Sequence, residues 1–121
     1  MLKRFDKAKS NPACNGSILG TSYIEYMKGD LEEFCWNFLK KGMKVYPHKH
    51  PKKEAYIFTR GKGIMKVDEE EMSVKEGDIV FIPPNSMHTT WNVEEEDLEF
   101  IIIGVKSPGF SARFIKKLAI R

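Results

Sequence analysis

The sequence predicts an all-β fold, either a sandwich or a closed barrel. Short stretches rich in β-branched and aromatic residues recur between Thr21 and Val105, separated by Gly, Pro, Asn and Asp. No stretch before residue 106 shows a convincing helical period. Because an α/β fold needs helices between its strands, many short strands with regular turns favour a sandwich or barrel instead.

Length and composition predict one globular domain, since the 121 residues are 41% hydrophobic and 31% charged. The 20 basic and 17 acidic side chains give a net charge of +3, which is too balanced to indicate a nucleic-acid-binding protein. No segment has the roughly 18 apolar residues of a membrane span, and the polar stretch from Lys3 to Lys9 is unlike a secretory signal. Cys14 and Cys35 form no C-x-x-C pair. We therefore expect a reduced, cytoplasmic protein.

The first third of the chain is predicted to be an arm followed by two strands. Residues 1–20 carry Asn-Pro and Asn-Gly pairs and no period, which indicates an arm with turns. Thr21 to Met27 is the first expected strand, and 31–39 is the second. A helix over 31–39 is the alternative, but the aromatic and β-branched neighbours favour a sheet.

Beyond Gly42 the predicted strands are shorter and closely spaced. They are Met43–Tyr46, Glu54–Thr59, Ile64–Val67, Glu71–Val74, Ile79–Ile82, Met87–Val93 and Leu98–Val105. Gly61-Lys62-Gly63 is expected to be a turn, and Pro83-Pro84 ends a strand because proline cannot donate to a ladder. After residue 106, Phe110, Phe114 and Leu118 recur at helical spacing. They predict a short C-terminal helix or tail that covers one barrel mouth or exchanges with a second subunit.

All three histidines lie in one part of the chain, His48 and His50 two residues apart and His88 after the proline turn, with Glu54 between them. On an extended chain His48 and His50 face the same side, about 6–7 Å apart. Three imidazoles and a carboxylate suit Fe, Mn, Ni, Cu or Zn better than Mg or Ca. An ion with six ligands would keep two positions open for water, substrate or dioxygen. The alternative, histidines without a metal, leaves the intervals between these four residues unexplained.

Two stretches resemble the two sequence motifs of the cupin superfamily. Gly42-x5-His48-x-His50-x3-Glu54-x6-Gly61 is similar to the first motif, and Gly77-x5-Pro83-x4-His88-x3-Asn92 is similar to the second. Asn85 stands where the family usually has glycine, and asparagine tolerates a positive φ better than most residues. The fifteen residues between the motifs resemble the spacing in compact, mostly prokaryotic members.

The resemblance implies a small single-domain cupin over residues 1–121, with a jelly-roll β-barrel (double-stranded β-helix) at about 22–105. It implies an N-terminal arm, a short C-terminal helix or tail, and a homodimer. The implied metal ligands are His48, His50, Glu54 and His88. The implied turn residues are Gly42, Gly61, Gly77, Pro83 and Asn85.

The family includes many activities, so the resemblance leaves the function open. One hypothesis is a metal-dependent enzyme acting on a small oxygenated molecule, by dioxygenase-type or Lewis-acid isomerase-type chemistry. The alternatives are a non-catalytic module that binds or senses a small molecule or metal, and a barrel in which the ion is only structural. Five aromatic side chains are candidates for the substrate pocket, with core packing as the other interpretation: Trp36, Phe38, Tyr46, Tyr56 and Phe58.

Overall fold

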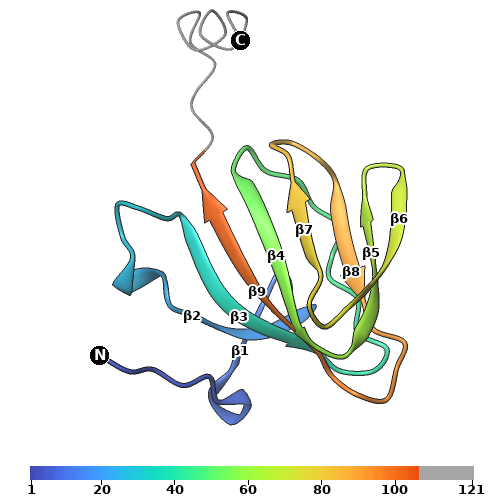
Figure 1. The fold of residues 1–121 in the computed structure, drawn as a ribbon, viewed down its shortest axis with the longest axis horizontal. Coiled ribbons are helices and arrows are strands. Elements are labelled where there is room, and N and C mark those ends of the chain that lie inside the picture. Colours follow the sequence, from blue (N-terminus) through green and yellow to red (C-terminus); the bar gives the residue numbers. More distant parts are fainter. Residues whose placement is uncertain (107–121) are drawn as a thin grey trace, which may run out of the picture.

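A computed structural model describes residues 1–106, and the predicted C-terminal helix lies outside the described residues. Two antiparallel sheets make up the fold (Figure 1). The larger has the order β1 (Asn11–Ala13), β2 (Ile18–Ser22), β3 (Glu33–Leu39), β9 (Leu98–Val105), β4 (Lys53–Arg60), β7 (Ile79–Ile82). The smaller has the order β6 (Glu70–Lys75), β5 (Lys62–Val67), β8 (His88–Trp91). The all-β, jelly-roll prediction is confirmed.

The inner faces of the two sheets enclose the hydrophobic core. The Tyr56 ring stacks on Phe100 at a centroid distance of 5.4 Å, and Phe58 packs against Phe100 at the same distance. Met65 from the smaller sheet and Leu98 from the larger one are fully buried in the same cluster. Alternate residues of each strand therefore point inward, as the period of two requires.

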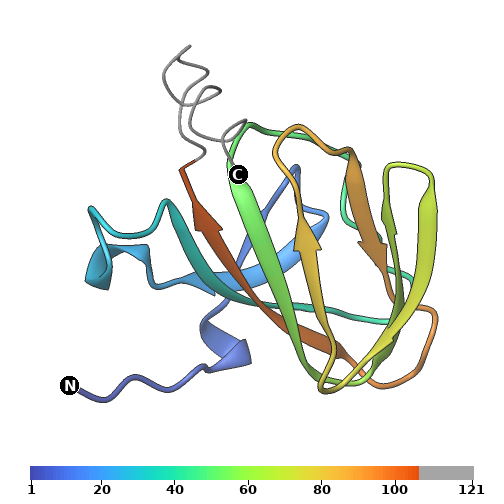
Figure 2. The same cartoon turned by 45° about the horizontal axis from the view of Figure 1, so that its top comes forward.

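The N-terminal part differs from the prediction. Strands β1 and β2 lie within the expected arm, and the expected strand Thr21–Met27 ends at Ser22 and gives way to the 3-10 helix η2 (Ile24–Tyr26). Ser22 ends the strand because its Oγ accepts a hydrogen bond from the Ile24 N–H, which bends the chain. A second 3-10 helix, η1 (Lys7–Lys9), lies in the arm. Figures 1 and 2 place this arm on the β2–β3 side, away from the β5–β6 hairpin.

The segment from residue 40 to 52 is irregular. The expected strand Met43–Tyr46 is only a single β-bridge between Lys44 and Trp91. The segment is attached to the barrel by Asn92, whose side-chain amide donates to the carbonyls of Leu39 and Glu96 and whose carbonyl accepts from the Gly42 N–H. The buried Asn92 thus joins the end of β3 to the chain beyond β8.

Four of the predicted turn residues adopt a positive φ, namely Gly42, Gly61, Gly77 and Asn85, while Pro83 directly follows β7. Gly61 is also needed for space, because a Cβ there would lie 2.4 Å from the Asp97 carbonyl oxygen. The turn at residues 61–63 is shorter than predicted, since β5 already begins at Lys62. Among residues 1–106, no helix is long and apolar enough to cross a membrane.

Candidate metal centre

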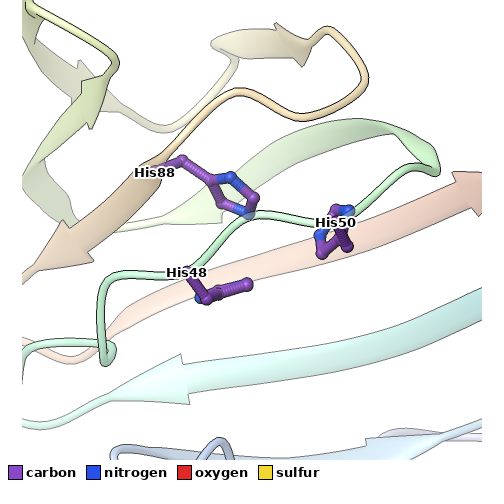
Figure 3. A group of neighbouring side chains, drawn as sticks. All are labelled: His48, His50 and His88. Carbon is purple, nitrogen blue, oxygen red and sulfur yellow. The ribbon is translucent and has the colours of Figure 1, made fainter.

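The three histidines come together at one end of the barrel interior (Figure 3). His88 is the first residue of β8, while His48 and His50 lie in the irregular segment before β4. One ring nitrogen from each residue lies within 4.8 Å of the other two. The backbones of His48 and His88 form an antiparallel bridge with N–H···O distances of 3.2 and 2.9 Å. Residues forty positions apart are therefore held side by side by main-chain bonds.

The protonation of each imidazole follows from its backbone partner. The Nδ1 atoms of the three rings lie 2.7, 3.2 and 2.8 Å from the carbonyl oxygens of Tyr46, Lys52 and Ser86, respectively. A carbonyl oxygen can only accept, so each Nδ1 carries the hydrogen. Each Nε2 therefore keeps a free lone pair. A histidine that binds a metal through one ring nitrogen usually has its other nitrogen hydrogen-bonded in this way.

Glu54 points into the same space from β4. Its Oε1 lies 2.7 Å from His50 Nε2 and 3.2 Å from His88 Nε2. None of these three atoms has a hydrogen-bond partner of suitable geometry, although all three are buried. Adjacent ligands of a six-coordinate ion with bonds of about 2.1 Å would be about 3.0 Å apart, close to both distances. The three histidines therefore could hold one metal ion, and Glu54 lies at ligand-to-ligand distance from two of them.

The electrostatics keep Glu54 ionised. Burial opposes its charge, but His88, the Glu33 carboxyl and His50 lower the pKa of Glu54 to about 2. Burial lowers the pKa of His48, and the neighbouring His88 and His50 lower it further. A carboxylate and neutral imidazoles are the protonation states that bind a metal ion.

A second carboxyl, Glu33 on β3, lies against Glu54. Burial and the charge of Glu54 raise the pKa of Glu33 to about 7, although Lys52 Nζ lies 3.1 Å from its Oε1. Because two neighbouring carboxyls resist double ionisation, Glu54 carries the charge and Glu33 retains the proton. The pair therefore places a proton donor, Glu33, and a proton acceptor, Glu54, beside the three histidines.

A cavity of about 360 Å³ adjoins Glu33, whereas Glu54 and the three histidines are not among its lining residues. Glu33, Cys35 and Asn37 line it from the inner face of β3, and Lys52 lines it from the chain before β4. Burial and the charge of Glu33 raise the pKa of Cys35 to about 12, so its thiol stays protonated. The cavity offers a carboxyl, an amide and an ammonium group to a small polar molecule.

The five aromatic residues proposed for the pocket lie in different places. Tyr56 is buried with its ring 6.0 Å from that of His88, and Phe58 lies in the core. The structure does not bring the other three to the site. Trp36 and Phe38 are on the opposite face of β3, where Phe5 covers them, and the Tyr46 side chain is 58% exposed. The carbonyl of Tyr46, rather than its ring, contacts the centre through His48.

The sequence interpretation missed Glu33 and Lys52. The signal for Glu33 was present, because 33, 35 and 37 alternate with the aromatic residues of 31–39 and carry Glu, Cys and Asn. Three polar residues on one side of a strand mark a face that meets water or a ligand. Lys52 had no comparable signal, since its position beside Glu33 depends on the pairing of β3, β9 and β4.

Comparison with known proteins places this geometry in context. Residues 35–104 match the family model described as Cupin domain. The chain is 30% identical over 99 residues to uncharacterized protein MJ1618 of Methanocaldococcus jannaschii, covering 80% of this chain and 79% of that protein. Two solved structures, each 21% identical, show a similar fold. They are the plu4264 protein of Photorhabdus luminescens (TM-score 0.78, 98% of each chain) and a predicted oxalate decarboxylase of Thermotoga maritima (TM-score 0.74, 86% of this chain and 99% of that one).

Proposed function

The chain belongs to the cupin family, and from this premise we propose that it is a metal-dependent enzyme acting on a small oxygenated organic molecule. In this proposal His48, His50, Glu54 and His88 hold one divalent transition-metal ion. The observation that carries it is the convergence of three Nε2 atoms whose Nδ1 partners are all backbone carbonyls. Such pre-set tautomers would serve no purpose in a site that stays apolar.

The residues of the centre favour a transition metal over Mg or Ca, because three of the four proposed ligands are nitrogen atoms. Bound there, Fe, Mn, Ni, Cu or Zn would supply Lewis-acid chemistry, and the redox-active metals among them would add oxygen chemistry. Four protein ligands leave open positions on a six-coordinate ion, which is the feature of a catalytic rather than a structural site.

The surrounding residues support a reaction that moves protons. The cavity next to Glu33 has room for a small molecule, and the Glu33 carboxyl also contacts Glu54. With a pKa near 7, Glu33 can give a proton to a bound molecule, or take one from it, at neutral pH. Lys52, 3.1 Å from Glu33, favours a substrate with negatively charged or carbonyl oxygens. The similar Thermotoga protein is described as a predicted oxalate decarboxylase, and oxalate is a small oxygenated acid.

The first test is the metal content of untagged protein, compared with the His50→Ala variant. We expect about one equivalent of Fe, Mn, Ni, Cu or Zn in the wild type and most of it lost in the variant. Lys49→Ala is the matched control, because Lys49 lies between the two histidines with its side chain exposed. A wild type that holds no metal and cannot be reloaded would contradict the proposed centre.

The catalytic claim has a separate test. The metal-loaded wild type and Glu33→Gln are assayed on a panel of small carboxylic and keto acids. Glu76→Gln is the control, because Glu76 is exposed and does not line the cavity. We expect metal-dependent turnover that falls about 10²–10⁴-fold in Glu33→Gln while the metal content is unchanged. Metal binding without turnover of any compound would instead favour a non-catalytic binding module.

A further inference from the structure

The two sheets leave a groove between two of their edge strands. Strand β7 ends the larger sheet and β6 ends the smaller one, and within residues 1–106 neither has a second hydrogen-bonded neighbour. A groove of about 540 Å³ lies between them, lined by residues of 67–72 on one side and of 79–83 on the other. We call it the β6–β7 groove. Because an edge strand exposes backbone N–H and C=O groups, such a groove can accept another segment of chain.

Much of the β6–β7 groove is apolar. Val67, Met72 and Val80 pack against the core but are only partly buried. Phe81 and Ile79 on β7 are 73% and 52% exposed. A contiguous apolar groove of this kind, rather than a scatter of single residues, indicates contact with another surface.

One wall of the β6–β7 groove is acidic. Asp68, Glu69 and Glu70 are exposed, and no basic residue of the described chain lines the groove. Within residues 1–106 none of these three carboxylates has an ion-pair partner. Asp68 accepts a hydrogen bond from the Met87 N–H at 2.9 Å, so this wall is attached to the turn that precedes His88. The groove therefore suits a segment that carries both apolar and basic side chains.

The C-terminal residues 107–121 have this composition. The segment contains no acidic residue. Its basic residues are Arg113, Lys116, Lys117 and Arg121, and its large apolar residues are Phe110, Phe114, Ile115, Leu118 and Ile120. Its charge is opposite to that of the acidic wall, and its apolar side chains match the rest of the groove.

The chain enters this segment close to the groove. The register pairs Val105 of β9 with Lys53, and it pairs the next residue of β4, Glu54, with Ile82 at the end of β7. Two strand spacings therefore separate the ends of β9 and β7, which is about 10 Å. Four residues of extended chain span about 13 Å, so Phe110 is within reach of the groove. Figures 1 and 2 show the ends of β9 and β7 and the β5–β6 turn at the same end of the barrel.

We propose that residues 107–121 bind in the β6–β7 groove of their own chain. Their apolar side chains cover Phe81 and Ile79, and their basic side chains pair with the acidic wall. The contact forms within one chain, because a segment tethered so close has an effective concentration on the order of millimolar at the groove. Since Asp68 is bonded to Met87, the bound segment also supports the turn that leads to His88.

The test is hydrogen exchange of the 121-residue chain, followed by mass spectrometry at about 1 µM and about 50 µM protein. We expect the amides of residues 110–121 to exchange at least about 10-fold more slowly than in a synthetic peptide of residues 107–121, at both concentrations. In Phe81→Lys, which places an unpaired charge in the contact, the exchange should rise to within about 2-fold of the peptide. Val93→Lys is the matched control, because Val93 is 55% exposed but does not line the groove, and it should retain slow exchange.

Reversing the charge of the acidic wall tests the choice of segment. Glu69→Lys combined with Glu70→Lys should speed the exchange of residues 110–121 by at least about 5-fold, because the wall then repels the basic side chains. Glu94→Lys combined with Glu95→Lys makes the same change of charge at exposed positions outside the groove and should leave the exchange unchanged.

Three results would overturn the proposal. The first is wild-type exchange at the rate of the peptide. The second is slow exchange that Phe81→Lys or the reversed wall leaves unchanged, since the segment would then bind elsewhere. The third is slow exchange only at the higher protein concentration, because the groove would then hold the segment of a second copy. Phe81 is 73% exposed, so its replacement leaves the core intact.

Discussion

The four proposed ligands divide into two pairs that are held in different ways. Glu54 and His88 lie in strands, with exposed fractions of 3% and 1%, and each has backbone partners on both sides. His48 and His50 lie in the irregular segment, are only partly buried, and have backbone partners on one side only: His88 for His48, through two hydrogen bonds, and a single N–H for His50. For His50 that contact is the Asn85 N–H, 2.7 Å from its carbonyl oxygen.

The difference indicates that the strands of the barrel fix Glu54 and His88, whereas contacts of the irregular segment with β8 and with the turn at Asn85 fix His48 and His50. The strand pair sets the position of the site, because moving Glu54 or His88 would disrupt a ladder. His48 and His50 can shift at smaller cost, so we expect them to be the ligands that would adjust to a bound ion. The strand pair also has an electrostatic cost, since Glu33 and Glu54 are two carboxyls placed in contact.

The largest expected effects come from two single variants, each of which removes one ligand of one pair. His88→Ala should weaken Zn²⁺ or Mn²⁺ binding by more than about 100-fold. Loss of a residue that only hydrogen-bonds to a ligand usually costs less than this. His48→Ala should cost only about 10-fold, because the segment can move and water can replace the ring. Titration calorimetry at pH 7.5 gives both values. Equal losses would show that the two pairs are held alike.

The contact between the Glu33 and Glu54 carboxyls predicts that the stability of the metal-free protein depends on pH. The pKa of Glu33 is raised to about 7, so its contribution to stability is complete below about pH 4.5 and is lost as the pH rises through 7. Between pH 5 and 7.5 we therefore expect Glu33→Gln to gain about 1–3 kcal/mol relative to the wild type. Urea unfolding in EDTA measures this difference. The exposed-site control Glu76→Gln should show none. A wild type and Glu33→Gln that respond alike to pH would refute the carboxyl pair.

The smallest expected effect concerns the contact that holds His50. Asn85 has a φ of 63°, so Asn85→Ala should lose about 1 kcal/mol, whereas Asn85→Gly should lose little or nothing. The alanine variant should also bind metal a few-fold more weakly, because the turn donates to the His50 carbonyl. Thermal unfolding and metal titration of the two variants give the comparison. A glycine variant as unstable as the alanine variant would show that the side chain, not the backbone angle, matters.

Much of the barrel was predictable from local signals. Ile79–Ile82 and Leu98–Val105 match β7 and β9 in full, because turn residues bound both strands. The positive φ expected at Asn85 is also present. The histidines were recognisable as a group because alternation on an extended chain and the position after the proline turn suggest a common side.

The inward face of β3 was the main misinterpretation. Aromatic residues at 34, 36 and 38 suggest a core-facing side, yet the polar residues Glu33, Cys35 and Asn37 line the interior cavity. The aromatic side is instead covered by Phe5 from the arm and borders a hollow of about 460 Å³ beside η2. The alternation distinguishes a polar side from an aromatic side, but nothing local to the strand shows which of the two a distant segment will cover.

The sequence by itself determined which residue types could bind a metal, where most strands begin and end, and that the fold is all-β. These properties depend on side-chain chemistry, on turns and on a period of two, all of which act over a few residues. Only the tertiary structure decided that Glu33 meets Glu54 and that Tyr46 contributes its carbonyl. Each depends on the register between strands distant in sequence, and a shift of one residue would turn every side chain to the other face.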